Sequence, residues 1–431
     1  MACSLARLHR SFLVRPTLSR RFRLSSISLD QHQRQFIPQQ LGGFEPVEEY
    51  RPGGFHPMSI GDEFAHGRYR VIHKLGFGGS STIWLARDQQ NHPGVTSRLV
   101  TLKAMRADVS SKSPNDLPEI AIPKSLQAAF REGNNDFQTV QDHFMVQGPN
   151  GNHRFLISPL AGPSVLAMLQ SPSARRLRRD LAVKVAKQTT SALRRMHSLG
   201  FAHGDLTTSN ILFRMSEEVL GWSDDEVYDY FGHPETEGVT RIDRRPGEPN
   251  APPTLDYKPG TILNYISPEM RFDGRTAGLQ TDIWALGCAI FEFRAGFPLF
   301  ESFFGSDVDI LKQAVETLGR LPDPWWGSFE ERTLWFEEDG EPKAEAQERA
   351  EVFLQSSKSS IRDKLRSIGM PDDAEWVAGK EGPMAEKSGV KMPEEEIELL
   401  GDLLEKMLRY LPEERIAIEE VVKHPWFEMR L

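Results

Sequence analysis

Few cysteines and no long apolar run mark this sequence. Its 431 residues include only two cysteines, Cys3 and Cys288, and neither lies in a cluster of histidines or cysteines. A zinc site needs such a cluster and a disulfide framework needs more cysteines, so we expect neither. No run of about 18 apolar residues occurs, which argues against a membrane span. With 39% hydrophobic and 26% charged residues, the composition is typical of a folded globular protein.

The first 29 residues lack acidic side chains and lysine but hold six arginines and several serines. Such a composition is typical of a mitochondrial transit peptide, and we predict one in residues 1–30. The alternatives are a disordered basic tail and a cytoplasmic or nuclear protein. Proline and glycine recur between Pro38 and Gly54, so residues 31–65 are predicted to form a linker or an arm that lies on the fold.

The rest of the chain is acidic. The formal net charge is −9, and without the first segment it is −15, because 46 basic residues then face 61 acidic ones. Duplex nucleic acid needs a neutralising basic face, so the charge argues against direct nucleic-acid binding. It favours a basic peptide as the partner.

Short β-rich runs open the folded region at Tyr69. The runs YRVIHKL, TIWLA and LVTLKAM alternate apolar and polar residues and are separated by glycine and polar segments. They predict a small antiparallel sheet. Most of the following sequence has a helical period, so we expect an α+β protein.

Apolar residues recur with a period near 3.6 from Ser173 onwards, which predicts a long helix. Its apolar face comprises Leu177, Leu181, Val185, Thr189, Leu193 and Met196. A second helix is expected around Val308, Leu311, Val315 and Leu318. The acidic stretch from Glu337 to Glu351 is predicted to be a solvated insertion.

A glycine-rich turn lies between the first two predicted strands, in the sequence LGFGGSSTIWLA. Gly76, Gly78 and Ser81 occupy the positions of a G-x-G-x-x-G pattern. Glycines there let backbone N–H groups approach phosphate oxygens, although a glycine hairpin without a ligand is the alternative. Lys103 follows in an apolar strand and needs an anion; Glu119 is its best-placed partner, and a snorkelling edge-strand lysine is the alternative.

The strongest chemical signal is FAHGDLTTSNILF, directly after the long helix. Asp205 and Asn210 offer a base for a hydroxyl group and an amide oxygen for Mg²⁺. Together with His203 they resemble the H-R-D-L-x-x-x-N catalytic loop of protein kinases.

The resemblance continues in the family's order from about Tyr69 to Phe427. SPE stands in place of A-P-E, TDIWALG follows it, and HPWF closes the chain. In the family, the position of Glu269 pairs with that of Arg415, and the position of Asp282 holds the backbone of the catalytic loop. These contacts are structural.

The resemblance implies a two-lobed fold. Residues 66–160 would form a small antiparallel amino-terminal lobe, and residues 161–431 a mainly helical carboxy-terminal lobe. Insertions are expected near residues 215–256 and 329–392. G-x-G-x-x-S followed by STIWLARD resembles the serine/arginine-rich splicing-factor kinases, and HFMVQGPNGNHRFLISPLAG resembles that subgroup's approach to the hinge. By that alignment Ser158 lies at the back of the nucleotide pocket.

The implied cofactors are ATP and Mg²⁺. Lys103, Asp205 and Asn210 would be catalytic, and Asn210 would also bind the metal. The residues expected around the nucleotide are Leu75, Gly76, Phe77, Gly78, Gly79, Ser80, Ser81, Ile83, Lys103, Glu119, Pro159 and Leu160. Pro159 has no N–H and would serve as an acceptor only.

Several positions depart from the family pattern. Thr101 replaces the small alanine of V-A-x-K and makes the adenine roof bulkier. Gly204 replaces the arginine of H-R-D, so activation by loop phosphorylation is not expected. Thr207 replaces the lysine that faces the transferred phosphoryl group, and such a loss could lower the rate by ~10²–10³.

The largest departure is the absence of D-F-G between Asn210 and Glu269. The aspartates in this interval are Asp224, Asp225, Asp229, Asp243 and Asp256. The first three lie in WSDDEVYDYF, which is predicted to be a helical insertion; Asp256 lies too near Glu269, and Asp243 has a poor strand context. Either the second magnesium ligand is lost, or the sequence lacks a segment near residues 253–257.

Three hypotheses follow. The chain is a monomeric protein serine/threonine kinase that phosphorylates basic Arg/Ser-rich proteins, or it is a pseudokinase that acts as a binding module. A small-molecule kinase of the aminoglycoside-phosphotransferase type is the third, because H-G-D-x-x-x-x-N is that family's form of the loop. SPE, DIWALG and HPWF argue against the third.

Overall fold

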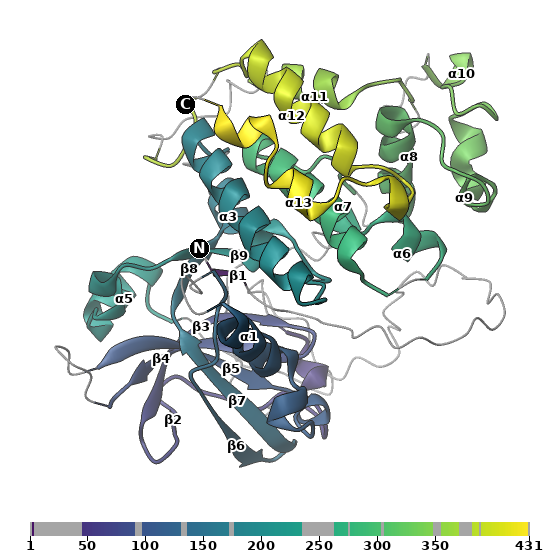
Figure 1. The fold of residues 1–431 in the computed structure, drawn as a ribbon. Coiled ribbons are helices and arrows are strands. Elements are labelled where there is room, and N and C mark those ends of the chain that lie inside the picture. Colours follow the sequence, from purple (N-terminus) through teal and green to yellow (C-terminus); the bar gives the residue numbers. More distant parts are fainter. Residues whose placement is uncertain are drawn as a thin grey trace.

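The computed structural model has two lobes, one built on a β-sheet and one mainly helical (Figure 1). The residues it describes are 2–3, 45–90, 97–130, 136–171, 176–234, 263–274, 276–302, 306–347, 355–369, 382–387 and 389–429. We use "amino-terminal lobe" for residues 45–160 and "carboxy-terminal lobe" for residues 161–429. The predicted α+β, two-lobed architecture is confirmed.

The amino-terminal lobe contains a six-stranded antiparallel sheet in the order β2-β3-β4-β5-β7-β6. Its strands are β2 (Glu63–Phe64), β3 (Tyr69–Gly78), β4 (Ser81–Asp88), β5 (Arg98–Met105), β6 (Asp142–Gly148) and β7 (Gly151–Pro159). The three runs predicted from Tyr69 onwards are β3, β4 and β5. Helix α1 (Pro118–Ala129) follows β5, after two 3₁₀ turns, η3 (Ala107–Val109) and η4 (Pro114–Asp116).

The alternation of side chains divides the sheet into two faces. Trp84, Val100 and Leu102 belong to one buried cluster with Met58, which comes from the segment preceding the sheet. Ile72, Leu85 and Leu99 belong to a different cluster. Lys103 and Thr101 alternate with Leu102 along β5, so they lie on the second face.

Residues 45–58 pack against the first face as an arm. Both Glu45 carboxylate oxygens lie 2.5 Å from Nζ of Lys74, and both side chains are fully buried. Burial lowers the pKa of Lys74, and the Glu45 charge opposes this effect. Arg106 adds an ion pair of 2.5 Å to Glu49, in the short turn η2 (Val47–Glu49), and covers the Phe55 ring. Buried pairing therefore fixes this part of the segment predicted as linker or arm.

The carboxy-terminal lobe has one large hydrophobic core around α7, whose residues from Thr281 to Ala295 are all buried. The α-helices of this lobe are α2 (Val165–Gln170), α3 (Arg179–Ser198), α4 (Glu217–Leu220), α5 (Asp224–Phe231), α6 (Pro268–Phe272), α7 (Leu279–Ala295), α8 (Asp307–Leu318), α9 (Trp325–Ser328), α10 (Ala344–Gln347), α11 (Ile361–Ser367), α12 (Glu394–Met407) and α13 (Ile418–Val421). Its 3₁₀ turns are η5 (Thr208–Asn210), η6 (Leu263–Tyr265), η7 (Glu330–Leu334), η10 (Pro412–Glu414) and η11 (Pro425–Glu428). The helix predicted around Val308 is α8.

The long helix begins later than predicted. Residues 176–178 are not helical, and α3 starts at Arg179. Leu177 instead forms a β-bridge with Ala385 and is buried in the core. Leu177 therefore fits the helical spacing of apolar residues although it lies outside the helix. The spacing of apolar residues reports which side chains are buried and does not report backbone conformation.

A second, three-stranded sheet joins residues 2–3 to the strand that follows the catalytic loop. Its order is β1 (Ala2–Cys3), β9 (Ile211–Arg214) and β8 (Ala161–Ser164), all antiparallel. β9 follows Asn210 directly. Residues 2 and 3, within the predicted transit peptide, thus pair with the strand that leaves the predicted catalytic loop.

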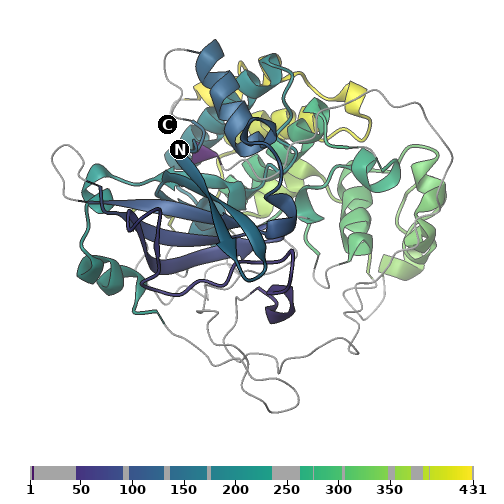
Figure 2. The same ribbon diagram turned by 90° about the horizontal axis from the view of Figure 1, so that it is seen from below.

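The insertion predicted near residues 329–392 is packed unevenly. The described residues of 329–347 and 355–369 contribute Phe329, Phe336 and Leu365 to the main core, so this insertion is not wholly solvated. Between Glu337 and Gln347 only Gly340 and Ala346 are buried, which agrees with the solvated stretch predicted there. Figure 2 shows the two lobes of the fold from below. Among the described residues, no helix has the length and apolar character needed to cross a bilayer.

Candidate active site

The glycine-rich turn is a β-hairpin between β3 and β4. Gly76 pairs with Ile83 and Gly78 pairs with Ser81, so Gly79 and Ser80 form the tip. The register shifts between Lys74 and Gly76, which marks a bulge at the first residues of the motif. The structure thus brings Leu75, Gly76, Phe77, Gly78, Gly79, Ser80, Ser81 and Ile83 together in one hairpin. Within the described residues, and apart from the chain neighbours, no atom lies within 4 Å of a Cβ placed on Gly76 or Gly78, so space is open on that side of the backbone.

Lys103 and Glu119 form the predicted ion pair. Nζ of Lys103 lies 3.0 Å from Oε1 of Glu119, and the two side chains are 23% and 16% exposed. Partial exposure leaves the ammonium accessible to a second anion. Glu119 lies in the first turn of α1, where the helix dipole favours a negative charge. Ile122 and Leu126 anchor the same helix in the core of the carboxy-terminal lobe.

The predicted hinge lies at the end of β7. Ser158 faces Thr101 across the β5–β7 ladder, and Leu160 is buried. The carbonyl of Pro159 accepts a hydrogen bond from Nε2 of Gln138 at 3.1 Å. A carbonyl oxygen has two lone pairs, so the Pro159 carbonyl can still accept a second donor. Sequence reasoning did not identify Gln138.

A buried carboxylate shapes the predicted catalytic loop. The Asp282 carboxylate accepts the backbone N–H groups of His203 and Gly204 at 2.7 and 2.8 Å, and it lies 2.9 Å from Nε2 of His197. The resemblance implied this role for Asp282. Because the residues of α7 from Thr281 to Ala295 are buried, the loop is attached to the core of the lobe.

Asn210 and Asp205 are linked within the loop. Nδ2 of Asn210 donates to the backbone carbonyl of Asp205 at 2.7 Å. This bond orients the amide so that its oxygen is turned away from that carbonyl and can accept from, or coordinate, another group. Backbone N–H of Asp205 donates to Nδ1 of His203 at 3.3 Å. The loop therefore positions one carboxylate and one amide oxygen five residues apart in sequence.

Gly204 replaces the family's arginine in a left-handed conformation, with φ of 73°. A side chain is disfavoured in that region, and glycine adopts it at little cost. Glycine therefore suits this backbone conformation, and the arginine's positive charge is absent. Thr207, at the position of the family's lysine, is buried and its hydroxyl contacts that of Ser209 at 2.6 Å.

A polar network that sequence reasoning missed lies beneath the loop. The Tyr265 hydroxyl donates to Oε2 of Glu292 and lies 2.9 Å from the Thr208 hydroxyl, which is also 3.3 Å from Glu292. Burial raises the pKa of Glu292 to about 8, and the Thr208 hydrogen bond only partly opposes it. The sequence signal that could have identified this network is Glu292, a charged residue inside the apolar run DIWALGCAIFEF. Three separate segments meet at this carboxyl group.

The Glu269–Arg415 contact implied by the resemblance is present. The two Arg415 terminal nitrogens lie 2.7 and 2.6 Å from the two Glu269 oxygens, and both side chains are buried. Arg415 also donates to the backbone carbonyls of Arg409, Gln280 and Tyr410. This pair joins α6 to the carboxy-terminal segment and takes no part in chemistry.

The aspartates considered for the second metal site fall into two groups. Asp224, Asp225 and Asp229 lie in α5, the predicted helical insertion. Arg70 and Arg87 bind the carboxylate of Asp224, so it is not free for a metal. Asp243 and Asp256 lie outside the described residues.

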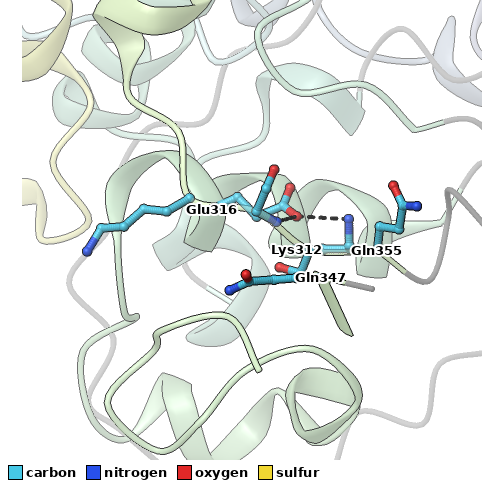
Figure 3. A pocket seen from close by; sticks show the side chains of 7 residues that line it. Lys312, Glu316, Gln347 and Gln355 are labelled. Carbon is cyan, nitrogen blue, oxygen red and sulfur yellow. Dashed lines mark hydrogen bonds and ion pairs between the residues drawn. The ribbon is translucent and has the colours of Figure 1, made fainter. Parts of the chain in front are cut away.

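A surface hollow elsewhere contains none of the predicted site residues. It has a volume of about 530 Å³ and is lined by Lys312, Glu316, Gln347, Gln355, Ser356, Ser357 and Lys358 (Figure 3). Lys312 and Glu316 pair with each other at 3.0 Å on α8. The candidate active site therefore consists of the glycine-rich hairpin, Lys103, the hinge and the catalytic loop, and the surface hollow is separate from it.

Comparison with known proteins agrees with this geometry. The model of the protein kinase domain matches residues 69–427. The chain belongs to the protein kinase family. The match begins at the first residue of β3 and ends beyond α13, so it contains most of both lobes and every described residue of the site.

The curated relatives of this kinase are serine/threonine-protein kinases. A serine/threonine-protein kinase SRPK of Physarum polycephalum is 25% identical over 423 residues, which cover 89% of this chain and 91% of that protein. Serine/threonine-protein kinase spk-1 of Caenorhabditis briggsae is 35% identical over 42% of this chain and 16% of its own length. Serine/threonine-protein kinase SKY1 of Saccharomyces cerevisiae is 31% identical over 40% of this chain and 23% of its own length.

The chain thus spans less than a quarter of two of these relatives and most of the third. The predicted similarity to the serine/arginine-rich splicing-factor kinases is confirmed.

Proposed function

We propose that this chain is a protein serine/threonine kinase that transfers the γ-phosphoryl group of ATP to basic, Arg/Ser-rich protein substrates. One observation carries the proposal: the Lys103–Glu119 ion pair and the Asp205–Asn210 loop, which Asp282 holds, occur together in a kinase fold. The acidic charge of the chain outside its first segment supports a basic substrate.

Each residue has a distinct role in this proposal. Lys103, oriented by Glu119, would bind phosphate oxygens of ATP, and the backbone of the glycine-rich hairpin would cover them. Asp205 would accept the proton of the substrate hydroxyl as the new P–O bond forms. The carbonyl of Pro159 and the backbone N–H of the hinge would bind adenine.

Asn210 would hold Mg²⁺ through its amide oxygen, which suits the preference of Mg²⁺ for oxygen ligands. When bound, Mg²⁺ would neutralise charge on the phosphates. Asp224 of α5 is bound by two arginines and is not free as a further ligand. Within the described residues, the donor set for the metal is thus partial.

The kinase assay that tests the proposal uses the full chain, Mg-ATP and an Arg/Ser-rich peptide, with an acidic peptide for comparison. We expect phosphorylation of the basic peptide, weaker phosphorylation of the acidic one, and none with Asp205→Asn. Asp225→Asn is a matched control, because it removes the same charge from an exposed helical position. Equal turnover of both peptides would contradict the substrate class.

A pseudokinase is the second candidate, and two observations favour it. The lysine position of the catalytic loop is the buried Thr207, and no D-F-G occurs in the sequence between Asn210 and Glu269. Binding of Mg-ATP without turnover, with retained binding of the Arg/Ser-rich peptide, would establish this alternative.

The amino-terminal segment is proposed to direct the protein to mitochondria, on the basis of its arginines and its lack of acids. A fusion of residues 1–44 to a fluorescent protein should accumulate in mitochondria. A matched fusion in which the six arginines of residues 1–29 are replaced by glutamine should not. A cytoplasmic or nuclear signal from the first fusion would refute the assignment.

A further inference from the structure

A segment of the carboxy-terminal lobe packs against the amino-terminal lobe. The chain leaves the catalytic loop through β9 and then forms α4 and α5. Figure 1 shows α5 beside the sheet of the amino-terminal lobe and away from the large helices of the other lobe. A short stretch of backbone therefore connects Asn210 to a helix that lies on the opposite lobe.

The apolar side of this segment covers the sheet near the hinge. Leu220 and Val227 are buried in one cluster with residues from β3, β4, β5 and the hinge, namely Ile72, Leu85, Leu99 and Leu160. Leu75 and Met215 pack against the same cluster. Leu75 opens the glycine-rich motif, so the cluster connects α5 to both nucleotide-facing elements, the hairpin and the hinge.

Asp224 fixes the helix in place through two arginines of the sheet. Its carboxylate lies 2.5 Å from Nη2 of Arg70 on β3 and 2.7 Å from Nη2 of Arg87 on β4. Arg87 is buried and also donates to the backbone carbonyl of Trp222 at 2.8 Å. Burial opposes ionisation of Asp224, but the arginine hydrogen bonds outweigh it and hold its pKa below the usual value.

Apart from the chain connection at the hinge, described side-chain contacts also join the lobes around α1 and α3. Ile122 and Leu126 of α1 enter the core of the carboxy-terminal lobe together with Phe137. Asp136 pairs with Arg195 of α3 at 2.8 Å. With attachments only in that region, the sheet could rotate about it, and a further attachment beside the hinge restricts such rotation.

We propose that α4 and α5 form an interlobe brace, in which Asp224 is a positioning residue that holds the glycine-rich hairpin and the hinge at a fixed orientation over the catalytic loop. The consequence for nucleotide affinity rests on the proposed function. A protein whose binding-competent orientation is only partly populated binds its ligand more weakly by that fraction. Loss of the brace therefore weakens nucleotide binding without touching the nucleotide.

The first test measures the nucleotide-free full chain by hydrogen–deuterium exchange. Asp224→Asn keeps the size of the side chain and removes its charge. We expect backbone amides of residues 72–78 and 158–161 to exchange several-fold faster than in the wild type. Asp225→Asn is the matched control, because Asp225 is exposed and no ion pair involves it within the described part of the chain. It should exchange like the wild type.

The second test measures binding of a fluorescent ATP analogue with Mg²⁺. Asp224→Asn should raise the Kd by roughly threefold to tenfold. Where turnover is measurable, KM for ATP should rise while kcat changes little. Arg70→Gln, which removes one guanidinium from the sheet side, should produce the same pattern. Thermal unfolding of each variant establishes that it is folded, and Arg70→Gln replaces Asp224→Asn if the latter does not fold.

Wild-type exchange and affinity in both Asp224→Asn and Arg70→Gln would overturn the brace. Equal effects of Asp225→Asn would also overturn it, because the cause would then be the general charge of the helix. Failure of the wild-type chain to bind the nucleotide would contradict the proposed function instead. The exchange measurement still decides the brace in that case, because it needs no ligand.

Discussion

Two regions of the molecule differ in how well they follow the kinase pattern. One comprises the buried ionic contacts that hold the catalytic loop and the carboxy-terminal lobe, and the other comprises the positions expected to face phosphate. Beneath the loop, Asp282 and the Glu269–Arg415 pair make every contact that the family implies. On the phosphate side, Gly204 and Thr207 stand where the family has cations, and D-F-G is absent from the sequence.

The difference separates two kinds of requirement. A buried carboxylate or guanidinium without its partner destabilises the fold itself, because an unpaired buried charge is costly. A lost charge at the phosphate side affects only ligand binding or rate. The fold can therefore tolerate changes on the phosphate side that it could not tolerate beneath the loop, and variants on the two sides should have different consequences.

The largest effect is expected for Arg415→Ala, which leaves Glu269 buried and unpaired. We expect a loss of about 3–5 kcal/mol in the free energy of unfolding, measured by chemical denaturation. Lys406→Ala is the control, because Lys406 pairs with Asp402 at 2.7 Å on the exposed surface of α12. It should change stability by no more than about 0.5 kcal/mol. Similar losses in both variants would show that burial does not distinguish these pairs.

The next effect concerns Glu292, whose pKa burial raises to about 8 from the ordinary value of 4.5. The folded state then keeps its proton while the unfolded state releases it, so stability falls as the pH rises from 4.5 to 8. The slope contributed by this group should be roughly 1 kcal/mol per pH unit. Glu292→Gln is neutral at every pH and should remove it. Denaturation at pH 5, 6.5 and 8 measures both proteins, and parallel pH profiles would contradict the assignment.

The phosphate side is tested by restoring a cation. If turnover occurs, Thr207→Lys should raise kcat by roughly tenfold to a hundredfold, because a positive charge then faces the transferred phosphoryl group. Thr207→Met is the matched control of similar length without charge, and it should not raise kcat. An equal change in both variants would assign the effect to packing around the buried Thr207.

A smaller effect on the pH dependence of stability is expected in the arm formed by residues 45–58, which packs on the first face of the sheet. The rings of His56 and His153 lie 4.7 Å apart. Burial, which is the larger effect, and the nearby His153, which is the smaller one, lower the pKa of His56 to about 4. The unfolded state binds a proton near pH 6.5 and the folded state does not, so stability is lost as the pH falls from 6.5 towards 4.

His56→Phe removes this proton-binding group and should be roughly 1–2 kcal/mol less sensitive to a change from pH 7 to pH 5 than the wild type. Denaturation at the two pH values measures the difference. An unchanged sensitivity would mean that His56 is not the group responsible, and His153→Phe would then test its neighbour.

The local features of the site could be predicted because each depends on a short stretch of sequence. The glycine-rich hairpin, the strand that carries Lys103 and the loop from His203 to Asn210 occur where their motifs predict them. The start of α3 was wrong by several residues, since Leu177 is buried through a β-bridge and not through the helix. Hydrophobic period reports burial, and burial has more than one structural cause.

By itself the sequence determined the strands β3, β4 and β5, the helices α3, α5 and α8, and the chemical groups of the site, because backbone preference and motif spacing act over a few residues. Only the tertiary structure decided that Asp224 binds two arginines of the other lobe and that Glu45 forms an ion pair with Lys74. It also decided that Glu292 belongs to a hydrogen-bond network with Tyr265 and Thr208. These contacts join residues far apart in the chain, and they depend on which faces pack together. Packing also sets the burial that raises or lowers each pKa, so the charge states of these groups belong to the fold and not to the sequence pattern.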